Sequence, residues 1–158
     1  MKQEFLHTIG ENEGLILKIC NIYCRESEDR EDLYQDIIIQ LWKSFPKFEN
    51  RSSISTWIYR ISLNVAISRY RKNLKQPSQE QLNNELPVID HQEVKEEDTK
   101  ALYQAIDSLS SVEKAIIMLY MEGIKYRQIG DIMNLTESNV GFKINVIKKK
   151  LKNILIQK

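Results

Sequence analysis

Residues 126–145, YRQIGDIMNLTESNVGFKIN, end one helical pattern at Asn134 and begin another within two residues. Apolar side chains at i, i+3 and i+4 predict the first helix. Asn134 tolerates the left-handed backbone that ends a helix, and Gly130 offers a smooth surface where another helix can approach closely. Thr136 is typical of an N-cap, and the acidic Glu137 suits the positive end of the helix that follows.

The second helical pattern has one apolar stripe and one polar, lysine-rich face. Spacings of three and four predict a buried stripe along a long helix: Val140, Ile144, Ile147, Leu151 and Leu155. The other face holds Ser138, Asn139, Lys143, Asn145, Lys148, Lys149 and Lys152. A short helix, a tight turn and a second helix with a polar tip are typical of a helix-turn-helix, whose second helix enters the DNA major groove. An ordinary helical hairpin is the alternative. The lysines favour DNA, because phosphate neutralisation dominates affinity.

The composition is that of a globular, all-α chain with room for one medium domain or two small ones. The chain has 158 residues, 42% of them hydrophobic and 28% charged, with only five Gly and three Pro. No apolar stretch approaches about 20 residues and no signal segment precedes the first helix, so we expect a cytoplasmic protein with no membrane insertion.

The sequence contains no pattern typical of a metal site or a catalytic site. Cys20 and Cys24 are the only cysteines and have no close His, whereas zinc usually takes four ligands, so we expect buried thiols. His7 and His91 stand alone, and there is no phosphate-cradling glycine loop or paired-carboxylate signature. We therefore expect no metal, no cofactor and no catalytic residue.

The charge is divided unevenly along the chain, although the net charge is only +1. Residues 1–75 carry 12 basic and 10 acidic side chains, and residues 101–158 carry 9 and 5. Residues 76–100 carry 2 basic and 7 acidic side chains, two of the three prolines and no sustained helical stripe. This pattern predicts two small helical domains, 1–75 and 101–158, joined by an acidic flexible linker, 76–100.

The N-terminal domain shows three helical patterns, over residues 13–25, 29–45 and 55–75. We expect the second to face inward with Leu33, Ile37, Ile38, Leu41, Trp42 and Phe45. Its opposite edge, called the acidic edge below, consists of Asp32, Gln35, Asp36 and Gln40, and such an edge is most often a solvated face. The third pattern has aromatic residues and a basic end, which suits single-stranded nucleic acid, although aromatics at helical spacing are more often core.

Two stretches resemble conserved regions of bacterial RNA polymerase sigma factors of the sigma-70 family. DREDLYQDIIIQLWKSFPKF followed by TWIYRISLNVAISRYRK, at residues 29–48 and 56–72, is similar to region 2, a bundle of three or four helices. LYQAIDSLSSVEKAIIMLYMEGIKYRQIGDIMNLTESNVGFKINVIKKKL, at residues 102–151, is similar to region 4, a helix-turn-helix domain. Both in this order, with no room for a region 3 between them, resemble the extracytoplasmic-function (ECF) group. The resemblance implies a non-enzymatic factor that binds core RNA polymerase and promoter DNA and promotes transcription initiation.

The resemblance also implies roles for particular side chains. Docking on the clamp helices of the polymerase β′ subunit implicates Asp32, Leu33, Gln35, Asp36 and Trp42. Binding of the −10 element, with a flipped base captured by residues 48–52, implicates Phe48, Asn50, Arg51, Trp57, Arg60, Asn64, Arg71 and Lys72. Binding of the −35 element implicates Arg127, Thr136, Glu137, Ser138, Asn139, Lys143 and Lys148. The polymerase β flap and a membrane-bound anti-sigma factor are further implied partners.

The chain departs from the family pattern at two places. The common NxxxD is here Asn64 to Ser68, and the Lys-Ser-Arg often found after the recognition Val is Gly141, Phe142 and Lys143. Gly141 shortens one expected DNA contact, and Phe142 either contacts a thymine methyl group or packs.

Two other functions stay open from the sequence. A DNA-binding regulator that does not engage polymerase would explain residues 101–158 but leaves the acidic edge and the third helical pattern without a role. A small enzyme or pure interaction module is favoured only by the modest total charge.

Overall fold

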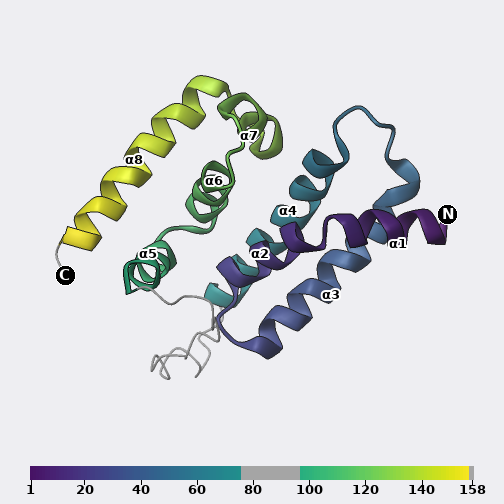
Figure 1. Ribbon diagram of the computed structural model, residues 1–158, viewed down its shortest axis with the longest axis horizontal. Coiled ribbons are helices and arrows are strands. Elements are labelled where there is room, and N and C mark those ends of the chain that lie inside the picture. The colour runs from purple at the N-terminus through teal and green to yellow at the C-terminus, as the bar shows by residue number, and fades with distance from the viewer. Residues whose placement is uncertain (76–96, 157–158) are drawn as a thin grey trace. The chain divides into compact units, whose positions relative to one another are not determined.

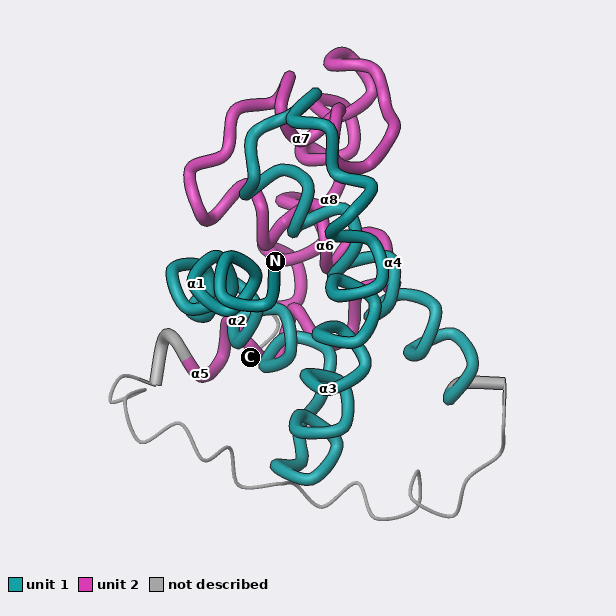
Figure 2. The backbone as a smooth tube through the Cα atoms, turned by 90° about the vertical axis from the view of Figure 1, so that its right-hand side faces the viewer, with its two compact units in different colours: residues 1–78 teal, residues 79–158 magenta. Residues whose placement is uncertain are grey.

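The computed structural model of the chain describes residues 1–75 and 97–156, which form helices joined by short loops, with no strand among them. They divide into two compact units, Met1–Ser78 and Gln79–Lys158 (Figure 2). The all-α prediction is therefore confirmed. Of the predicted linker, residues 76–96 lie outside the described part, and residues 97–100 are already helical.

The described residues of unit 1 form α1 (Lys2–Glu11), α2 (Glu13–Tyr23), α3 (Ser27–Ser44), the short 3-10 helix η1 (Phe45–Lys47) and α4 (Ile54–Lys75) (Figure 1). Helix α4 packs against both α2 and α3, which also pack against each other. They meet in a core of fully buried side chains: Ile16, Ile19, Leu33, Ile37, Leu41, Ile58 and Leu63. Along α2 and α3 these residues lie three or four positions apart, so each helix buries one apolar stripe.

The three predicted helices of unit 1 are present, but one helix was missed and one side chain was misplaced. Helix α1 was not among the predicted patterns, because it buries only Phe5 and Ile9 and so carries a short apolar signal. Trp42, predicted to face inward, is 44% exposed, and its ring meets Phe5 edge to face with centroids 5.0 Å apart. It lies about 100° around α3 from the buried stripe. Ile38 and Phe45 are half-buried.

Unit 2 contains, in its described residues, α5 (Glu97–Asp107), α6 (Ser111–Met121), α7 (Tyr126–Met133) and α8 (Glu137–Ile156). The long α8 packs against each of the other three (Figure 1). Its apolar stripe is buried as predicted at Val140, Ile144, Ile147 and Leu151, while Leu155 is half-buried near the helix end. One continuous stripe therefore holds three short helices around a single core.

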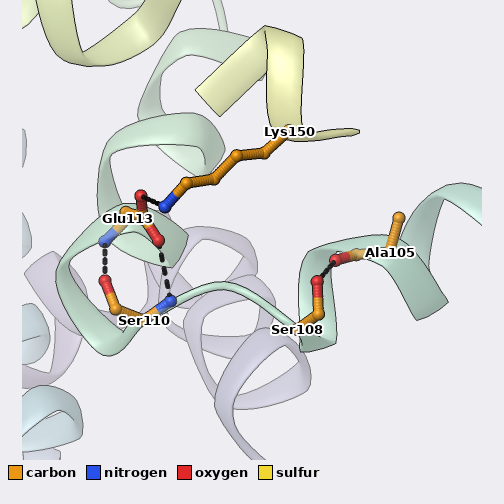
Figure 3. Close-up of polar contacts among 5 residues, drawn as sticks. All are labelled: Ala105, Ser108, Ser110, Glu113 and Lys150. Carbon is orange, nitrogen blue, oxygen red and sulfur yellow. Dashed lines mark hydrogen bonds and ion pairs between the residues drawn. The ribbon is translucent and has the colours of Figure 1, made fainter. Parts of the chain in front are cut away.

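A polar network fixes the start of α6 against α8 (Figure 3). Ser110 caps α6: its Oγ accepts from the Glu113 backbone N–H at 3.2 Å, and the Glu113 carboxylate accepts from the Ser110 N–H at 3.0 Å. Lys150 of α8 donates to the other Glu113 oxygen at 2.6 Å. Burial raises the pKa of Glu113, but the hydrogen bonds from Lys150 and Ser110 outweigh it and hold that pKa below its ordinary value. The ionised carboxylate is therefore the form that joins the two helices.

Candidate nucleic-acid interface

The turn between α7 and α8 has the geometry of a tight helix-turn-helix. Asn134 adopts the left-handed conformation, with φ 61° and ψ 49°, and the Leu135 N–H donates to the Gly130 carbonyl at 2.9 Å. Thr136 caps α8, since its Oγ1 accepts from the Asn139 backbone N–H at 3.1 Å. Both predictions, the reversal at Asn134 and the cap at Thr136, are confirmed.

Gly130 is needed for a different reason from the one predicted. A Cβ at this position would lie 2.5 Å from the backbone oxygen of Leu135. No real Cβ contact is so short, and a backbone oxygen held in a turn cannot easily move away. The glycine therefore makes room for the turn itself and not for a separate helix.

The predicted −35 residues lie mostly on the exposed surface of unit 2. Arg127 of α7 and, around the start of α8, Thr136, Glu137, Ser138 and Asn139 are exposed, and Lys143 is half-buried. Lys148 is exposed too, but its ammonium lies 4.4 Å from the centre of the Tyr120 ring of α6. Its interaction with the Tyr120 side chain raises the pKa of Lys148, so this side chain stays cationic. Lys148 therefore has a packing role that the sequence pattern did not indicate.

Gly141 and Phe142, which differ from the family pattern at the start of α8, have different structural roles. A Cβ at Gly141 would lie 3.4 Å from Cε2 of Tyr126, so this position lies against that ring, which can adjust to a small side chain. Phe142, the next residue, is 68% exposed. Of the two alternatives stated for Phe142, packing within unit 2 is therefore wrong.

In unit 1 the predicted base-capture loop closes one side of a pocket. Asn50 has a positive φ of 57°, and the Phe48 ring lies 5.0 Å from that of Trp57. Phe48 and Asn50 line a pocket of about 560 Å³ whose opposite wall comes from α1, including Glu4 and Thr8. The sequence did not indicate this wall, because α1 was not predicted. Phe5 and Ile9, the buried residues of α1, are four positions apart, and this spacing is the sequence signal that could have predicted the helix.

Helix α4 presents the other predicted −10 residues on one exposed face. Arg60, Asn64 and Arg71 lie within a narrow arc around the helix and are exposed, with the half-buried Trp57 at its beginning. Lys72, also exposed, and Asn64 border an open groove of about 810 Å³ between α3 and α4. Arg51, in the preceding loop, is exposed, and its Nη2 lies 3.6 Å from Glu49 Oε1.

The acidic edge of α3 is exposed but internally paired. Asp32, Gln35 and Asp36 are exposed, yet Arg69 of α4 binds the Asp36 carboxylate and its Nη2 lies 3.8 Å from Asp32 Oδ2. Arg69 lies in the basic end of the third helical pattern, and nothing in that pattern indicated its pairing with α3.

Two hydrophobic residues change the surface that surrounds the acidic edge. Leu33, predicted to contact polymerase, is only 1% exposed, so it belongs to the core and not to a docking surface. Ile39, which the prediction omitted, is 48% exposed on α3. With the exposed Trp42 it places apolar area near the acidic residues.

The described residues include no group of three or more His, Cys, Asp or Glu side chains that could hold a metal ion. Cys20 is buried, as predicted, but Cys24 is only half-buried, and neither forms a disulfide bond. Burial, and secondarily Cys24, raises the pKa of Cys20 to about 12. None of the helices in residues 1–75 and 97–156 is long and apolar enough to cross a membrane.

Comparison with known proteins assigns both units to one family. The model of Sigma-70 region 2 matches residues 8–76, and that of Sigma-70, region 4 matches residues 99–151. Neither describes a catalytic domain.

Among curated relatives, the ECF RNA polymerase sigma factor SigX of Bacillus subtilis (strain 168) is 26% identical over 126 residues. That match covers 73% of this chain but less than two thirds of SigX, 65%. SigW of the same organism, also an ECF RNA polymerase sigma factor, is 24% identical over 159 residues, covering 88% of this chain and 84% of SigW.

The fold is shared with a solved sigma factor. The structure of RpoE in complex with the anti-sigma factor NepR, from Bartonella quintana, matches with a TM-score of 0.72 and 20% identity. The match covers 98% of this chain and 95% of that one.

Proposed function

Because the chain belongs to the sigma-70 family, in its ECF group, we propose that it acts in the bacterial cytoplasm as an RNA polymerase sigma factor. It binds core polymerase, recognises the −10 and −35 elements of promoter DNA and promotes initiation. The single observation that carries this proposal is the helix-turn-helix of unit 2. Thr136 caps its second helix, which then begins with three exposed residues, Glu137 to Asn139.

The −35 element is read by α8. Ser138 and Asn139 are short, exposed polar side chains that can hydrogen-bond base edges in the major groove. Arg127, Lys143 and Lys148 supply positive charge beside them, which suits the phosphate backbone.

The −10 element is bound by unit 1. Opening duplex DNA costs about 1.4 kcal/mol of stacking per base-pair step, and binding an extruded base in a protein pocket offsets part of this cost. The pocket beside Phe48 and Asn50 has an aromatic wall and polar groups suited to such a base. The exposed arginines of α4, Arg60 and Arg71, follow the strand backbone.

Core polymerase binds the exposed face of α3. Carboxylates that face a basic partner steer association and fix register, and exposed apolar side chains near them supply area to bury. We assign this surface to Asp32, Gln35, Asp36 and Trp42, add Ile39, and remove the buried Leu33. Unit 2 docks on the β flap, and an anti-sigma partner, as in the RpoE complex with NepR, regulates the factor.

Run-off transcription tests the proposal. Core polymerase from the source bacterium, purified free of sigma factors, is mixed with the full chain and a genomic promoter library. We expect transcripts from a discrete set of start sites only when the chain is present. Sequence-specific DNA binding without transcripts would instead support a DNA-binding regulator. Neither binding nor transcripts would support an interaction module without a DNA role.

A further inference from the structure

Phe142 is the most outward-directed residue near the start of α8. The buried residues Val140, Ile144, Ile147 and Leu151 define the inner face of this helix. At about 100° per residue, Phe142 projects almost opposite the middle of that face. Its side chain is accordingly 68% exposed, a large apolar surface left in water.

The residues around Phe142 form a polar face with cations on both flanks. Within about 60° of it and two turns along the helix lie four exposed polar side chains: Ser138, Asn139, Asn145 and Lys149. The half-buried Val146 also lies in this arc. Farther around the helix Lys143 lies on one flank, and Lys148 and Lys152 lie on the other. Lys150, on the same flank as Lys143, is bound to Glu113. A helix in the major groove meets base edges in front and phosphates at both sides, so this arrangement fits DNA with Phe142 toward the bases.

The chemistry of the groove limits what Phe142 can contact. Its ring offers no conventional hydrogen bond to the nitrogen and oxygen atoms of base edges. The C5-methyl group of thymine is the apolar group that the major groove presents. A contact with this methyl group removes apolar surface from water on both sides, which hydrogen-bonding neighbours such as Asn139 do not achieve.

We propose that Phe142 is a specificity-determining residue that recognises the methyl group of a thymine in the −35 element. The proposal rests on the proposed function, since it requires that α8 read duplex DNA. It explains why an aromatic residue occupies the outermost position of a face whose other exposed residues near the helix start are polar. A protein partner that buries Phe142 is the competing explanation.

The test uses deoxyuridine, which pairs as thymine does but lacks the methyl group. Holoenzyme is assembled from core polymerase and the full chain, and preferred duplexes are selected from a library randomised over the −35 element. Each thymine of the selected element is then replaced singly by deoxyuridine. We expect one replacement to weaken wild-type binding about fourfold, the value for one buried methyl group.

The same duplexes are then measured with Phe142→Ala and Phe142→Leu. We expect Phe142→Ala to bind the thymine duplex less tightly than wild type. Replacing thymine by deoxyuridine should not lower the affinity of this variant further, because the Phe142 ring and the methyl group form a single contact. Phe142→Leu, which keeps apolar surface, should retain part of the methyl dependence. Circular dichroism melting should be unchanged in both variants, because Phe142 is exposed.

The outcomes separate the two levels of the proposal. A preferred element without thymine, or one in which every deoxyuridine replacement is neutral, overturns the assignment of Phe142 and leaves the proposed function standing. Weaker assembly of Phe142→Ala with core polymerase, without change in base preference, assigns the residue to a protein interface and overturns it too. Selection that yields no preferred sequence contradicts the proposed function itself.

Discussion

Arg69 of α4 binds the carboxylate of Asp36 on α3 across the groove between the two helices. The proposed polymerase-docking surface is therefore partly neutralised from within unit 1. Arg69 also joins the helix of the docking surface to the helix that carries the −10 residues. The pair is half-exposed, with 28% of the Arg69 and 50% of the Asp36 side chain accessible, so its contribution to folding stability is about 1 kcal/mol or less.

Reversing the charge of the acidic edge should weaken polymerase binding. Asp32→Arg with Asp36→Arg places cations against a basic partner, so we expect a marked loss of affinity for core polymerase. It also places two new arginines beside Arg69, so a small drop in melting temperature is expected. The matched control is Asp36→Arg with Arg69→Glu, which restores the internal pair with opposite polarity. It should melt like wild type if the internal pair sets stability. Wild-type affinity for core polymerase in the double-arginine variant would remove the acidic edge from the interface.

Gly130→Ala should destabilise unit 2, although alanine favours helices. The added Cβ would lie 2.5 Å from the Leu135 backbone oxygen, and overpacking of this kind typically costs about 1–3 kcal/mol. Gly141→Ala is the matched control, since its Cβ would meet the edge of the Tyr126 ring at 3.4 Å, where a side chain can adjust. Urea unfolding of both variants gives the comparison. Equal stability of the two would mean that the turn is looser than its geometry indicates.

Ser62→Ala should leave unit 1 as stable as wild type or make it more stable. Ser62 is 0% exposed, and within the described residues its Oγ has no hydrogen-bond partner. Such a hydroxyl carries a desolvation cost without compensation, and alanine removes it. Ser110→Ala in unit 2 is the contrasting variant: it deletes a serine whose hydroxyl is hydrogen-bonded as the cap of α6, so it should lower the free energy of unfolding by about 1 kcal/mol. Destabilisation by Ser62→Ala in thermal melting would indicate an unrecognised partner for this hydroxyl.

Local patterns and long-range contacts differed in how well they were predicted. The buried stripe of α8 and the reversal at Asn134 follow from spacing and backbone preference within a few residues, and both were correct. The pairing of Arg69 with Asp36 joins residues 33 positions apart, which no local pattern encodes. Trp42 was misplaced because it was grouped with the apolar residues next to it in the sequence, although it lies about 100° around the helix from the buried stripe, where it meets a neighbouring helix. Here that neighbour is α1, a helix that was not among the predicted patterns.

Alkaline pH should weaken unit 1. Burial raises the pKa of Cys20 to about 12 and raises that of Tyr23 as well. The unfolded chain therefore releases these protons first, and the stability that the two groups contribute is fully present below about pH 9 and falls as the pH rises toward 12. Urea unfolding of unit 1, followed by tryptophan fluorescence, should show this loss, since both Trp residues lie in that unit. A flat profile from pH 8 to 11 would contradict it.

Acidic pH should act on unit 2 in the opposite sense. The pKa of Glu113 is held below its ordinary value, so the ionised form contributes stability that is present at neutral pH. That contribution is lost as the pH falls below the ordinary carboxyl range. Glu113→Gln should flatten this acid dependence while it lowers stability at neutral pH, because Lys150 loses its anionic partner. An unchanged acid profile in the variant would mean that other carboxylates control it.

Two exposed residues of α8, Asn139 and Lys148, should separate base recognition from phosphate binding. Asn139 lies at the capped tip, and its side chain can reach a base edge, so Asn139→Ala should relax preference at one or two −35 positions, with about 1–3 kcal/mol of discrimination lost. The salt dependence of binding should stay as in wild type. Lys148→Ala should instead weaken binding to all sequences alike and reduce the slope of log affinity against log salt by about one.

The position of Lys148 over the Tyr120 ring adds a control to this experiment. Lys148→Arg keeps both the charge and the contact with the ring, so it should retain the wild-type salt slope, whereas Lys148→Met keeps only packing and should behave like the alanine variant. The measurement is holoenzyme binding to −35 point-mutant duplexes over a salt series. If Asn139→Ala leaves every base preference intact, the tip of α8 contacts protein and does not read DNA. If Lys148→Met keeps the full salt slope, the lysine serves only to hold α8 against α6.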